Sequence, residues 1–342
     1  MADNNRVLNA EDLSVDIEVP SGTLHAVTDV TLHVDKGETL GIVGESGCGK
    51  SITSLAIMNL LPGKAKLTAS KLELGGRDLL SLSEKEFAKL RGDQMGMIFQ
   101  DPMTSLNPVY RIGEQLEEVY TQHGKGGRRE ARERAAFLLD KVGITGPTER
   151  LSQYPHQLSG GLRQRMMIAM TLMCDPILVI ADEPTTALDV TMQAQTLNLL
   201  NSLQDEFNMA MILITHDLGV VARMADRVMV MYAGTAVETG TSEEVFDRPT
   251  HPYTQGLLRC IPNPGQATTN SRLGSIKGIV PALVGHLSGC MFRSRCEYAV
   301  DQCYSGNIPF HEVGPGRGYR CHLEEKDCAR NFENGLVRDV VY

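Results

Sequence analysis

The chain has 342 residues, with 33 Lys and Arg against 42 Asp and Glu, so its formal net charge is −9. Hydrophobic residues make up 42% and charged residues 22%, which is typical of a globular protein with a full core. The acidic balance argues against broad electrostatic binding to nucleic acid. Aromatic residues are only 5% and Trp is absent, which disfavours a stacking platform for sugars or bases. The length allows two domains, or one large domain with an appendage.

No apolar run approaches the roughly 18–20 residues that a transmembrane helix needs. The N-terminal stretch MADNNRVLNAEDL is polar and acidic, unlike a signal or transit peptide. We therefore expect a cytosolic chain. Its eight cysteines are then more often metal ligands or free thiols than disulfides.

Residues 7–40 contain short alternating segments separated by turn residues, a pattern that predicts antiparallel strands. From residue 38 to about 240, apolar strand-like runs alternate with helical patterns. The runs are 39–44, 95–100, 177–182 and 210–216. Between the last two, Leu197, Leu200, Leu203 and Phe207 recur at helical spacing on one face. Buried strands joined by helices predict a parallel sheet covered on both faces.

Two regions depart from this alternation. Residues 101–170 are charged and helix-forming (EQLEEVY, RREARERAAFLLDKVG), which predicts an inserted α-helical subdomain. After about residue 255 the chain is rich in Gly, Pro and Cys and has no strong period. We expect a separate, small, Cys-rich C-terminal module there.

A glycine-rich loop follows the first predicted buried strand and precedes a helical pattern, ITSLAIMNLL. The loop is Gly44, Glu45, Ser46, Gly47, Cys48, Gly49, Lys50 and Ser51. This fits a P-loop, whose backbone N–H groups surround phosphate oxygens at the positive end of a helix. Lys50 would reach the β- and γ-phosphates, and the Ser51 hydroxyl would bind Mg²⁺. Cys48 is expected to be a tolerated small residue rather than a nucleophile.

Two carboxylates stand at the end of the apolar run 177–182. Asp182 would hold the Mg²⁺ shell, and Glu183 would polarise the attacking water. The alternative, an acidic pair at a helix start, does not account for two carboxylates at a strand end in a P-loop protein. The pattern therefore predicts nucleotide hydrolysis.

The segment LSGGLRQR places Ser159, Gly160 and Gly161 at an apparent helix start. This is a second phosphate-binding surface without a Lys or a metal ligand, and such a surface is useful only when it faces the P-loop of another subunit. It resembles the signature motif of ABC-type ATPases, which close a nucleotide between two chains. The family implies a P-loop NTPase fold with a RecA-like parallel sheet, ATP and Mg²⁺.

The other motifs of that family occur in order. Gln100 resembles the Q-loop residue that senses Mg²⁺ and the attacking water, and Ala187-Leu188-Asp189 resembles the D-loop, which implies nucleotide contact for Asp189. His216 resembles the switch histidine that contacts the γ-phosphate. The resemblance covers essentially the whole chain. One departure is the absence of an aromatic residue for adenine near residues 21–25, where His25 is expected to be structural or exposed.

Three features favour an importer subunit over soluble relatives acting on DNA or ribosomes, which remain the alternative. The chain has one cassette, no long coiled-coil insertion and no membrane segment. Within the importers, residues 100–108, residues 251–258 and the run GLRQRMMIAM resemble ATP-binding subunits of the oligopeptide/dipeptide/nickel family. Leu162 is more like the first of the two unequal ATPases in these systems. Residues 1–255 would be the nucleotide-binding domain and 256–342 the C-terminal module.

This resemblance implies a set of partners and a location. The partners are a second homologous ATPase in a heterodimer, two transmembrane permeases and an extracytoplasmic solute-binding protein, with no nucleic acid. The chain would be peripheral, on the cytoplasmic face of the inner (plasma) membrane. The cargo stays open among dipeptides, oligopeptides, nickel, opines and glycosides.

Four cysteines lie within 32 residues of loop-like sequence: Cys290, Cys296, Cys303 and Cys321. Four thiolates suit a tetrahedral metal or a cluster, although the spacing is not the short CxxC of zinc ribbons. The run from Cys290 to Cys296 resembles the pattern CxFxxRC that some importer ATPases link to a [4Fe–4S] cluster. Zinc and free thiols remain alternatives. Cys328 is a spare, and Cys174 and Cys260 would be small buried hydrophobes.

Overall fold

The structure is a computed structural model that describes residues 5–101, 105–186, 188–261, 276–281, 283–285 and 288–330. The chain divides into two compact units. The first unit takes the described residues of 1–9, 33–39 and 72–214, and the second unit takes those of 10–32, 40–71 and 215–342.

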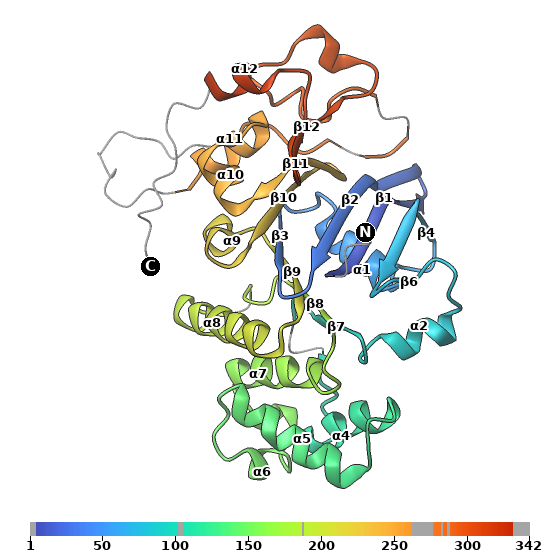
Figure 1. The fold of residues 1–342 in the computed structure, drawn as a ribbon, viewed down its shortest axis with the longest axis vertical. Helices are drawn as coiled ribbons and strands as arrows, with labels where there is room; N and C mark the ends of the chain where they lie inside the picture. Colours follow the sequence, from blue (N-terminus) through green and yellow to red (C-terminus); the bar gives the residue numbers. More distant parts are fainter. Residues whose placement is uncertain are drawn as a thin grey trace. The chain divides into compact units, whose positions relative to one another are not determined.

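Most of the elements are labelled in Figure 1. The strands are β1 (Arg6–Val19), β2 (Gly22–Asp35), β3 (Thr39–Val43), β4 (Ala65–Thr68), β5 (Lys71–Leu74), β6 (Arg77–Asp78), β7 (Met95–Ile98), β8 (Leu178–Asp182), β9 (Ala210–Thr215), β10 (Arg227–Tyr232), β11 (Thr235–Thr241), β12 (Phe310–Gly314) and β13 (Arg317–Arg320). The helices are α1 (Lys50–Ile57), α2 (Glu84–Leu90), α4 (Ile112–Gln122), α5 (Arg128–Lys141), α6 (Pro147–Arg150), α7 (Gly160–Thr171), α8 (Val190–Phe207), α9 (Leu218–Met224), α10 (Ser242–Asp247), α11 (Pro252–Arg259) and α12 (Glu325–Arg330), with 3₁₀ turns η1 (Pro155–Gln157) and η2 (Asp301–Tyr304).

The N-terminal strands confirm the predicted antiparallel sheet. Strands β1 and β2 are each 14 residues long and are separated by only two residues, so they form a hairpin. Strand β4 pairs antiparallel with β1, from Ser14 opposite Thr68 to Ile17 opposite Ala65. Burial alternates along β1, where Leu13 and Val15 are fully buried. One face of the hairpin therefore packs into a core while the other is more accessible.

The first unit contains the predicted parallel strands. Strand β8 pairs in parallel with β7, with Leu178 opposite Met95, and with β9, with Leu178 opposite Ala210. Every residue of these three strands is buried, which explains why their sequences are continuous apolar runs. Helix α8 joins β8 to β9 and packs through a buried leucine face. The predicted helical spacing is therefore confirmed there, with Phe207 half-buried at its end.

The predicted helical insertion is also present in the first unit. Its described residues form α4, α5, α6 and α7, which Figure 1 shows gathered together. In helix α5 the charged side chains Arg129 and Glu133 are exposed, whereas Ala131, Ala135 and Leu138 are buried. None of the described helices is long and apolar enough to cross a membrane.

The sheet of the second unit is mixed rather than wholly parallel, which corrects the predicted parallel sheet. Strand β10 is parallel to β3 but antiparallel to β11. The turn between β10 and β11 is two residues, Ala233 and Gly234, at φ of +48° and +79°. A two-residue turn with both residues at positive φ forces the strands to run antiparallel. The sequence analysis took no account of this hairpin.

The segment after residue 255 also contains strands, although its sequence has no strong period. Strands β12 and β13 form an antiparallel hairpin, and β13 pairs with β11, with Tyr319 opposite Glu238. The pairing adds the C-terminal hairpin to the edge of the sheet of the second unit. The four-residue strand β13 begins with Arg317 and Gly318. It is too short and too glycine-rich to give a period-2 signal.

Candidate functional site

The glycine-rich loop connects β3 to α1 in the second unit, and two of its glycines are required by space. Gly44 and Gly49 have φ of +155° and +103°. A Cβ on Gly44 would lie 2.2 Å from the Met231 carbonyl oxygen, and one on Gly49 would lie 2.7 Å from the Ala26 carbonyl oxygen. Because backbone atoms cannot move aside cheaply, only glycine fits at either position.

Lys50 is the first residue of α1 and is only 5% exposed. Its Nζ donates to the carbonyl oxygens of Gly44, at 2.8 Å, and Glu45, at 3.1 Å, so its ammonium lies across the loop. The first turn of α1 contains no acidic residue. A buried ammonium at the positive end of a helix is an arrangement suited to a polyphosphate.

The remaining loop residues differ in exposure. Ser46, Gly47 and Ser51 are exposed, whereas Cys48 is fully buried. Burial raises the pKa of the Cys48 thiol, although the nearby Lys50 partly opposes this. A buried thiol with a raised pKa is a poor nucleophile, which agrees with its expected role as a small packing residue.

The predicted catalytic carboxylates lie in the first unit. Asp182 ends β8 and is 7% exposed, and Glu183 follows it with the unusual φ of +46°. The Glu183 N–H donates to the Ile214 carbonyl oxygen at 2.8 Å. A non-glycine residue in the left-handed region is strained, and such strain is frequent at functional sites.

The structure brings Gln100 together with Glu183. The Gln100 Nε2 donates to the Glu183 Oε2 at 3.1 Å, and the Thr186 hydroxyl donates to the same oxygen at 2.8 Å. One carboxylate oxygen therefore accepts two hydrogen bonds that orient it. The predicted Mg²⁺ ligands Asp182, Gln100 and Ser51 supply only oxygen atoms, the ligand type that Mg²⁺ prefers.

The signature residues occupy the start of α7. Ser159 caps this helix, because its Oγ accepts from the Leu162 N–H at 3.4 Å. Ser159 and Gly160 are exposed. A Cβ on Gly160 would have no described atom within 4 Å. The surface at this helix start is therefore open to a large ligand or a second chain.

A buried amide links the signature helix to the carboxylate segment. Gln164 is 1% exposed, and its Nε2 donates to the carbonyl oxygen of Pro184, the residue after Glu183. The sequence analysis did not single out Gln164. The signal available was a polar residue one turn into α7 that lies among buried methionines.

The remaining described residues singled out from the sequence lie at the ends of α8 and β9 and on β2. Asp189 caps α8 and accepts from the Met192 N–H at 3.0 Å. Ala187 lies outside the described residues. His216 follows β9 and is exposed. His25 is half-buried and its Nδ1 lies 2.7 Å from the Asp16 Oδ1, which favours the expected structural role.

The four predicted metal-binding cysteines are all described, but no support for a metal site emerges. Among the described residues, no group of three or more His, Cys, Asp or Glu is placed to hold a metal ion. Burial raises the pKa of Cys290 to about 11 and of Cys296 to about 12, so both favour the neutral thiol. Cys260, expected to be buried, is half-exposed.

Cys328, which the sequence analysis left over, has a partner. It is fully buried, and a hydrogen bond between its side chain and that of Cys321 lowers the pKa of Cys321 to about 7. Cys321 therefore contacts Cys328, and Cys303 and Cys321 also help to raise the pKa of both Cys290 and Cys296. This arrangement corrects the description of Cys328 as a spare.

Comparison with known families gives two matches along the chain. The family described as ABC transporter matches residues 27–186. The family described as oligopeptide/dipeptide transporter, C-terminal region, matches residues 237–303. The two matches cover the glycine-rich loop, the carboxylates and the signature helix, and the start of the cysteine-containing segment.

Two relatives match over most of their length. The dipeptide transport ATP-binding protein DppD of Escherichia coli (strain K12) is 49% identical over 324 residues, 95% of this chain and 98% of the relative. The oligopeptide transport ATP-binding protein AppD of Bacillus subtilis (strain 168) is 49% identical over 306 residues, 89% of this chain and 92% of the relative.

Solved structures give the same class. The ATP-binding cassette MJ0796, in a dimeric post-hydrolysis state bound to ADP and Pi, is 26% identical with a TM-score of 0.61, covering 69% of this chain and 98% of that one. The cbiO1 protein of Clostridium perfringens is 27% identical with a TM-score of 0.60, covering 71% and 91%. The fold is that of an ABC ATPase cassette. The chain belongs to the ABC transporter family of ATP-binding proteins.

Proposed function

We propose that the chain is the ATP-binding and ATP-hydrolysing subunit of an ABC importer for dipeptides or oligopeptides. The observation that carries the proposal is the 49% identity to a dipeptide transport ATP-binding protein along 95% of this chain. The match of residues 237–303 to the C-terminal region of oligopeptide/dipeptide transporters supports the same cargo class. ATP hydrolysis is the activity of the cassette.

The first step of the proposed mechanism is nucleotide binding by the glycine-rich loop. Lys50 would exchange its contacts with the Gly44 and Glu45 carbonyls for the β- and γ-phosphates. Ser51, Asp182 and Gln100 would hold Mg²⁺, which would neutralise phosphate charge. Hydrogen bonds from the loop and the start of α1 would complete the phosphate site.

The second step is hydrolysis. Glu183 would take a proton from the attacking water, and Gln100 and Thr186 hold its carboxylate in one orientation. The exposed His216 would contact the γ-phosphate. Ser159, Gly160 and Gly161 would face the nucleotide held by a second ATPase chain, together with Asp189. The exposure of Ser159 and Gly160 supports this role.

We also propose the assembly that the family implies. The chain would pair with a second homologous ATPase, dock on two transmembrane permeases and work with an extracytoplasmic solute-binding protein. It would be peripheral to the membrane, on the cytoplasmic face. Val109 and Tyr110 are 72% and 54% exposed just after the Gln100 segment. Exposed apolar side chains there suit a permease contact.

The division of the chain into a nucleotide-binding domain at 1–255 and a C-terminal module at 256–342 is part of the same proposal. Two different family models match residues 27–186 and 237–303, which supports two regions, although the second match begins before residue 256.

The [4Fe–4S] cluster on Cys290, Cys296, Cys303 and Cys321 stays a prediction from the sequence. Anaerobic purification followed by iron, sulfide and zinc analysis tests it. Stoichiometric iron and sulfide would support the cluster, zinc alone the alternative metal, and neither would favour free thiols.

The test of the proposed function is purification of the tagged chain from its native membrane in a gentle detergent. A second ATPase and two multi-span permeases should accompany it, and peptide should stimulate ATP hydrolysis in the presence of the binding protein. Ribosomes or DNA-repair proteins as the only companions would contradict the importer and leave the ATPase activity in place. The Lys50→Ala variant should lose nucleotide binding.

A further inference from the structure

An acidic residue occupies the second position of the phosphate loop, and a distant arginine neutralises it. Arg295 forms a bidentate ion pair with the Glu45 carboxylate. Its Nη1 donates to Oε2 at 2.5 Å and its Nη2 donates to Oε1 at 2.9 Å. The two residues are 250 positions apart in the chain. Paired parallel hydrogen bonds of this kind fix orientation as well as charge.

The guanidinium of Arg295 is itself held firmly. Its side chain is 3% exposed, and it lies over the Tyr232 ring at 5.7 Å from the centroid. Its Nε donates to the Lys277 carbonyl oxygen at 3.0 Å, and its Nη2 donates to that of Ile276 at 3.2 Å. A buried arginine with this many contacts has little freedom, so it holds Glu45 in one place.

A second residue from the same part of the chain contacts the loop backbone. The Tyr253 hydroxyl accepts from the Glu45 N–H at 2.9 Å. The Tyr253 ring is fully buried and packs against Tyr232, at 4.6 Å between centroids, and Phe292, at 5.4 Å. Phe292 and Arg295 belong to the same turn, so this turn contacts both the carboxylate and its backbone support.

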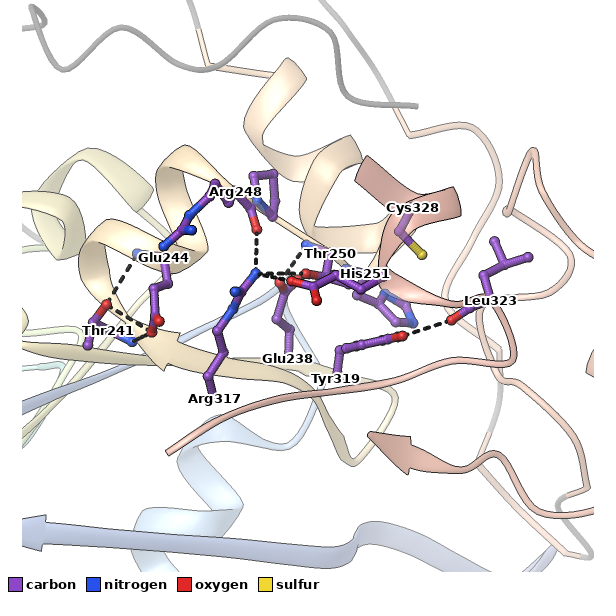
Figure 2. A network of polar contacts seen from close by, with 12 residues as sticks. Glu238, Thr241, Glu244, Arg248, Thr250, His251, Arg317, Tyr319, Leu323 and Cys328 are labelled. Carbon is purple, nitrogen blue, oxygen red and sulfur yellow. Dashed lines mark hydrogen bonds and ion pairs between the residues drawn. The ribbon is translucent and has the colours of Figure 1, made fainter. Parts of the chain in front are cut away.

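Figure 2 shows a polar network that includes Glu238, Thr250 and His251, just before Tyr253 in the chain. The buried Glu238 carboxylate accepts from the Thr250 N–H at 2.6 Å and the His251 N–H at 2.9 Å. The His251 Nδ1 then accepts from the Tyr253 N–H at 3.0 Å. Figure 2 also shows Arg317 of β13 reaching the Arg248 carbonyl oxygen and Thr250. Strand β13 therefore supports the same segment.

The charge balance explains why this matters for a triphosphate. An unpaired carboxylate in the loop would repel the phosphates, because like charges a few ångströms apart in a partly desolvated site interact strongly. Lys50 also contacts this loop, and in the proposed site it is needed for the phosphates themselves. Because Arg295 neutralises the Glu45 carboxylate, the Lys50 ammonium is free to bind the phosphates.

We propose that Arg295 and Tyr253 are positioning residues of the ATP site, through which the segment after residue 250 sets the charge and conformation of the phosphate loop at Glu45. The proposal rests on the proposed ATP site. It assigns to this segment a direct effect on nucleotide affinity, in addition to its packing. The contacts of both residues with the loop are to Glu45, so they act through Glu45.

The test compares the full chain with three variants by equilibrium titration with a fluorescent ATP analogue. Arg295→Met keeps the apolar stem but removes the charge, and its affinity should be about tenfold weaker because Glu45 is left unpaired. In Glu45→Gln/Arg295→Met the repelling charge is gone, and affinity should return to within about threefold of wild type. Arg293→Met is the matched control, because Arg293 donates only within its own turn and contacts the Tyr304 ring.

Steady-state kinetics of the assembled transporter supply a second readout. Arg295→Met should raise the KM for ATP more than it lowers kcat, because the chemical step uses other residues. Unchanged affinity in Arg295→Met would overturn the proposal. An equal loss in Arg293→Met, or no recovery in the double variant, would also overturn it by showing a folding effect alone. Failure of the wild-type chain to bind the analogue would instead overturn the proposed ATP site.

Discussion

The two surfaces that we propose to contact phosphate differ in how their own chain supports them. The glycine-rich loop of the second unit has two buried glycines, Gly44 and Gly49, a 5% exposed lysine and direct contacts from Arg295 and Tyr253. The signature surface of the first unit, Ser159 and Gly160, is exposed. It is held by the Ser159 cap on the first turn of α7.

The difference follows from what each surface has to do. A loop that holds a triphosphate needs converging N–H groups and a positioned cation before the ligand arrives, so its own chain must fix it. A surface that closes over another chain's nucleotide has to stay open until the chains meet. Substitutions at the loop should therefore act within this chain, and those at the signature surface should act only in the assembled transporter.

The largest effect is expected at Glu183. In Glu183→Gln the side chain keeps its size and its contacts with Gln100 and Thr186, but it no longer accepts a proton. Phosphate release should fall by about 10²–10⁴-fold while ATP binding is retained. Glu206→Gln is the control, because Glu206 contacts Lys141 on the surface of the same unit. Wild-type turnover in Glu183→Gln would remove Glu183 from the mechanism.

The next prediction tests whether the signature surface, unlike the glycine-rich loop, acts only in the assembled transporter. A side chain on Gly160 meets no described atom within 4 Å, so Gly160→Asp should fold normally and bind ATP as wild type does. In the transporter, its carboxylate would face the partner chain's triphosphate, and hydrolysis should fall by about tenfold or more. Gly127→Asp, equally open and in the same unit, should leave hydrolysis unchanged. A loss of ATP binding by isolated Gly160→Asp chain would contradict the comparison.

The third effect is a pH dependence of stability from Glu238, whose carboxylate accepts from the backbone of the segment that leads to Tyr253. Burial raises the pKa of Glu238 to about 7, although hydrogen bonds from Thr254, Thr250 and His251 and the charge of Arg317 oppose this. The unfolded chain has a Glu pKa of about 4.3. The folded chain therefore binds an extra proton between these values, and the free energy of unfolding falls as pH rises through this window.

The slope that Glu238 adds should approach 1.4 kcal/mol per pH unit near pH 5.5–6.5 and vanish above about pH 8. Burial also lowers the pKa of His251 to about 3, so this histidine stays neutral throughout the window. Urea unfolding of the full chain from pH 5 to 8 measures the slope. Glu238→Gln should flatten it. A slope that is the same in both proteins would place the titrating group elsewhere.

The smallest effect is expected at Tyr253. Tyr253→Phe keeps the aromatic packing and leaves the Glu45 N–H without its acceptor. The free energy of unfolding should fall by about 1 kcal/mol, and ATP affinity should weaken by less than about threefold. Tyr304→Phe is the control, because Tyr304 is 59% exposed. A larger loss of affinity than in Arg295→Met would mean that the backbone contact outweighs the charge pair.

Local patterns predicted much of the fold and of the nucleotide site. The runs at 177–182 and 210–216 became β8 and β9, and the leucine spacing at 197–203 became the buried face of α8. These predictions succeeded because burial on both faces of a parallel strand requires a continuous apolar run. The β10–β11 hairpin was missed because its turn, Ala233-Gly234, is not one of the common turn dipeptides.

The cysteine segment shows what spacing along the chain does not predict. Spacing along the chain suggested one four-cysteine site and left Cys328 over, and the structure adds a hydrogen bond between Cys321 and Cys328. Sequence spacing says which thiols are near in the chain. It does not say which side chains point toward one another once β12, β13 and α12 have formed, because backbone direction decides that.

The sequence by itself determined the class of chemistry, because a phosphate loop and the proposed metal-binding and catalytic carboxylates are short local patterns with a local physical requirement. Only the tertiary structure decided what supports them. Glu45 and Arg295 are 250 positions apart, and Glu45 and Tyr253 are 208 apart. Such pairs carry no periodic signal, since their contact arises from packing of the sheet of the second unit with the C-terminal segment. The charge and position of the phosphate loop are therefore properties of the folded chain.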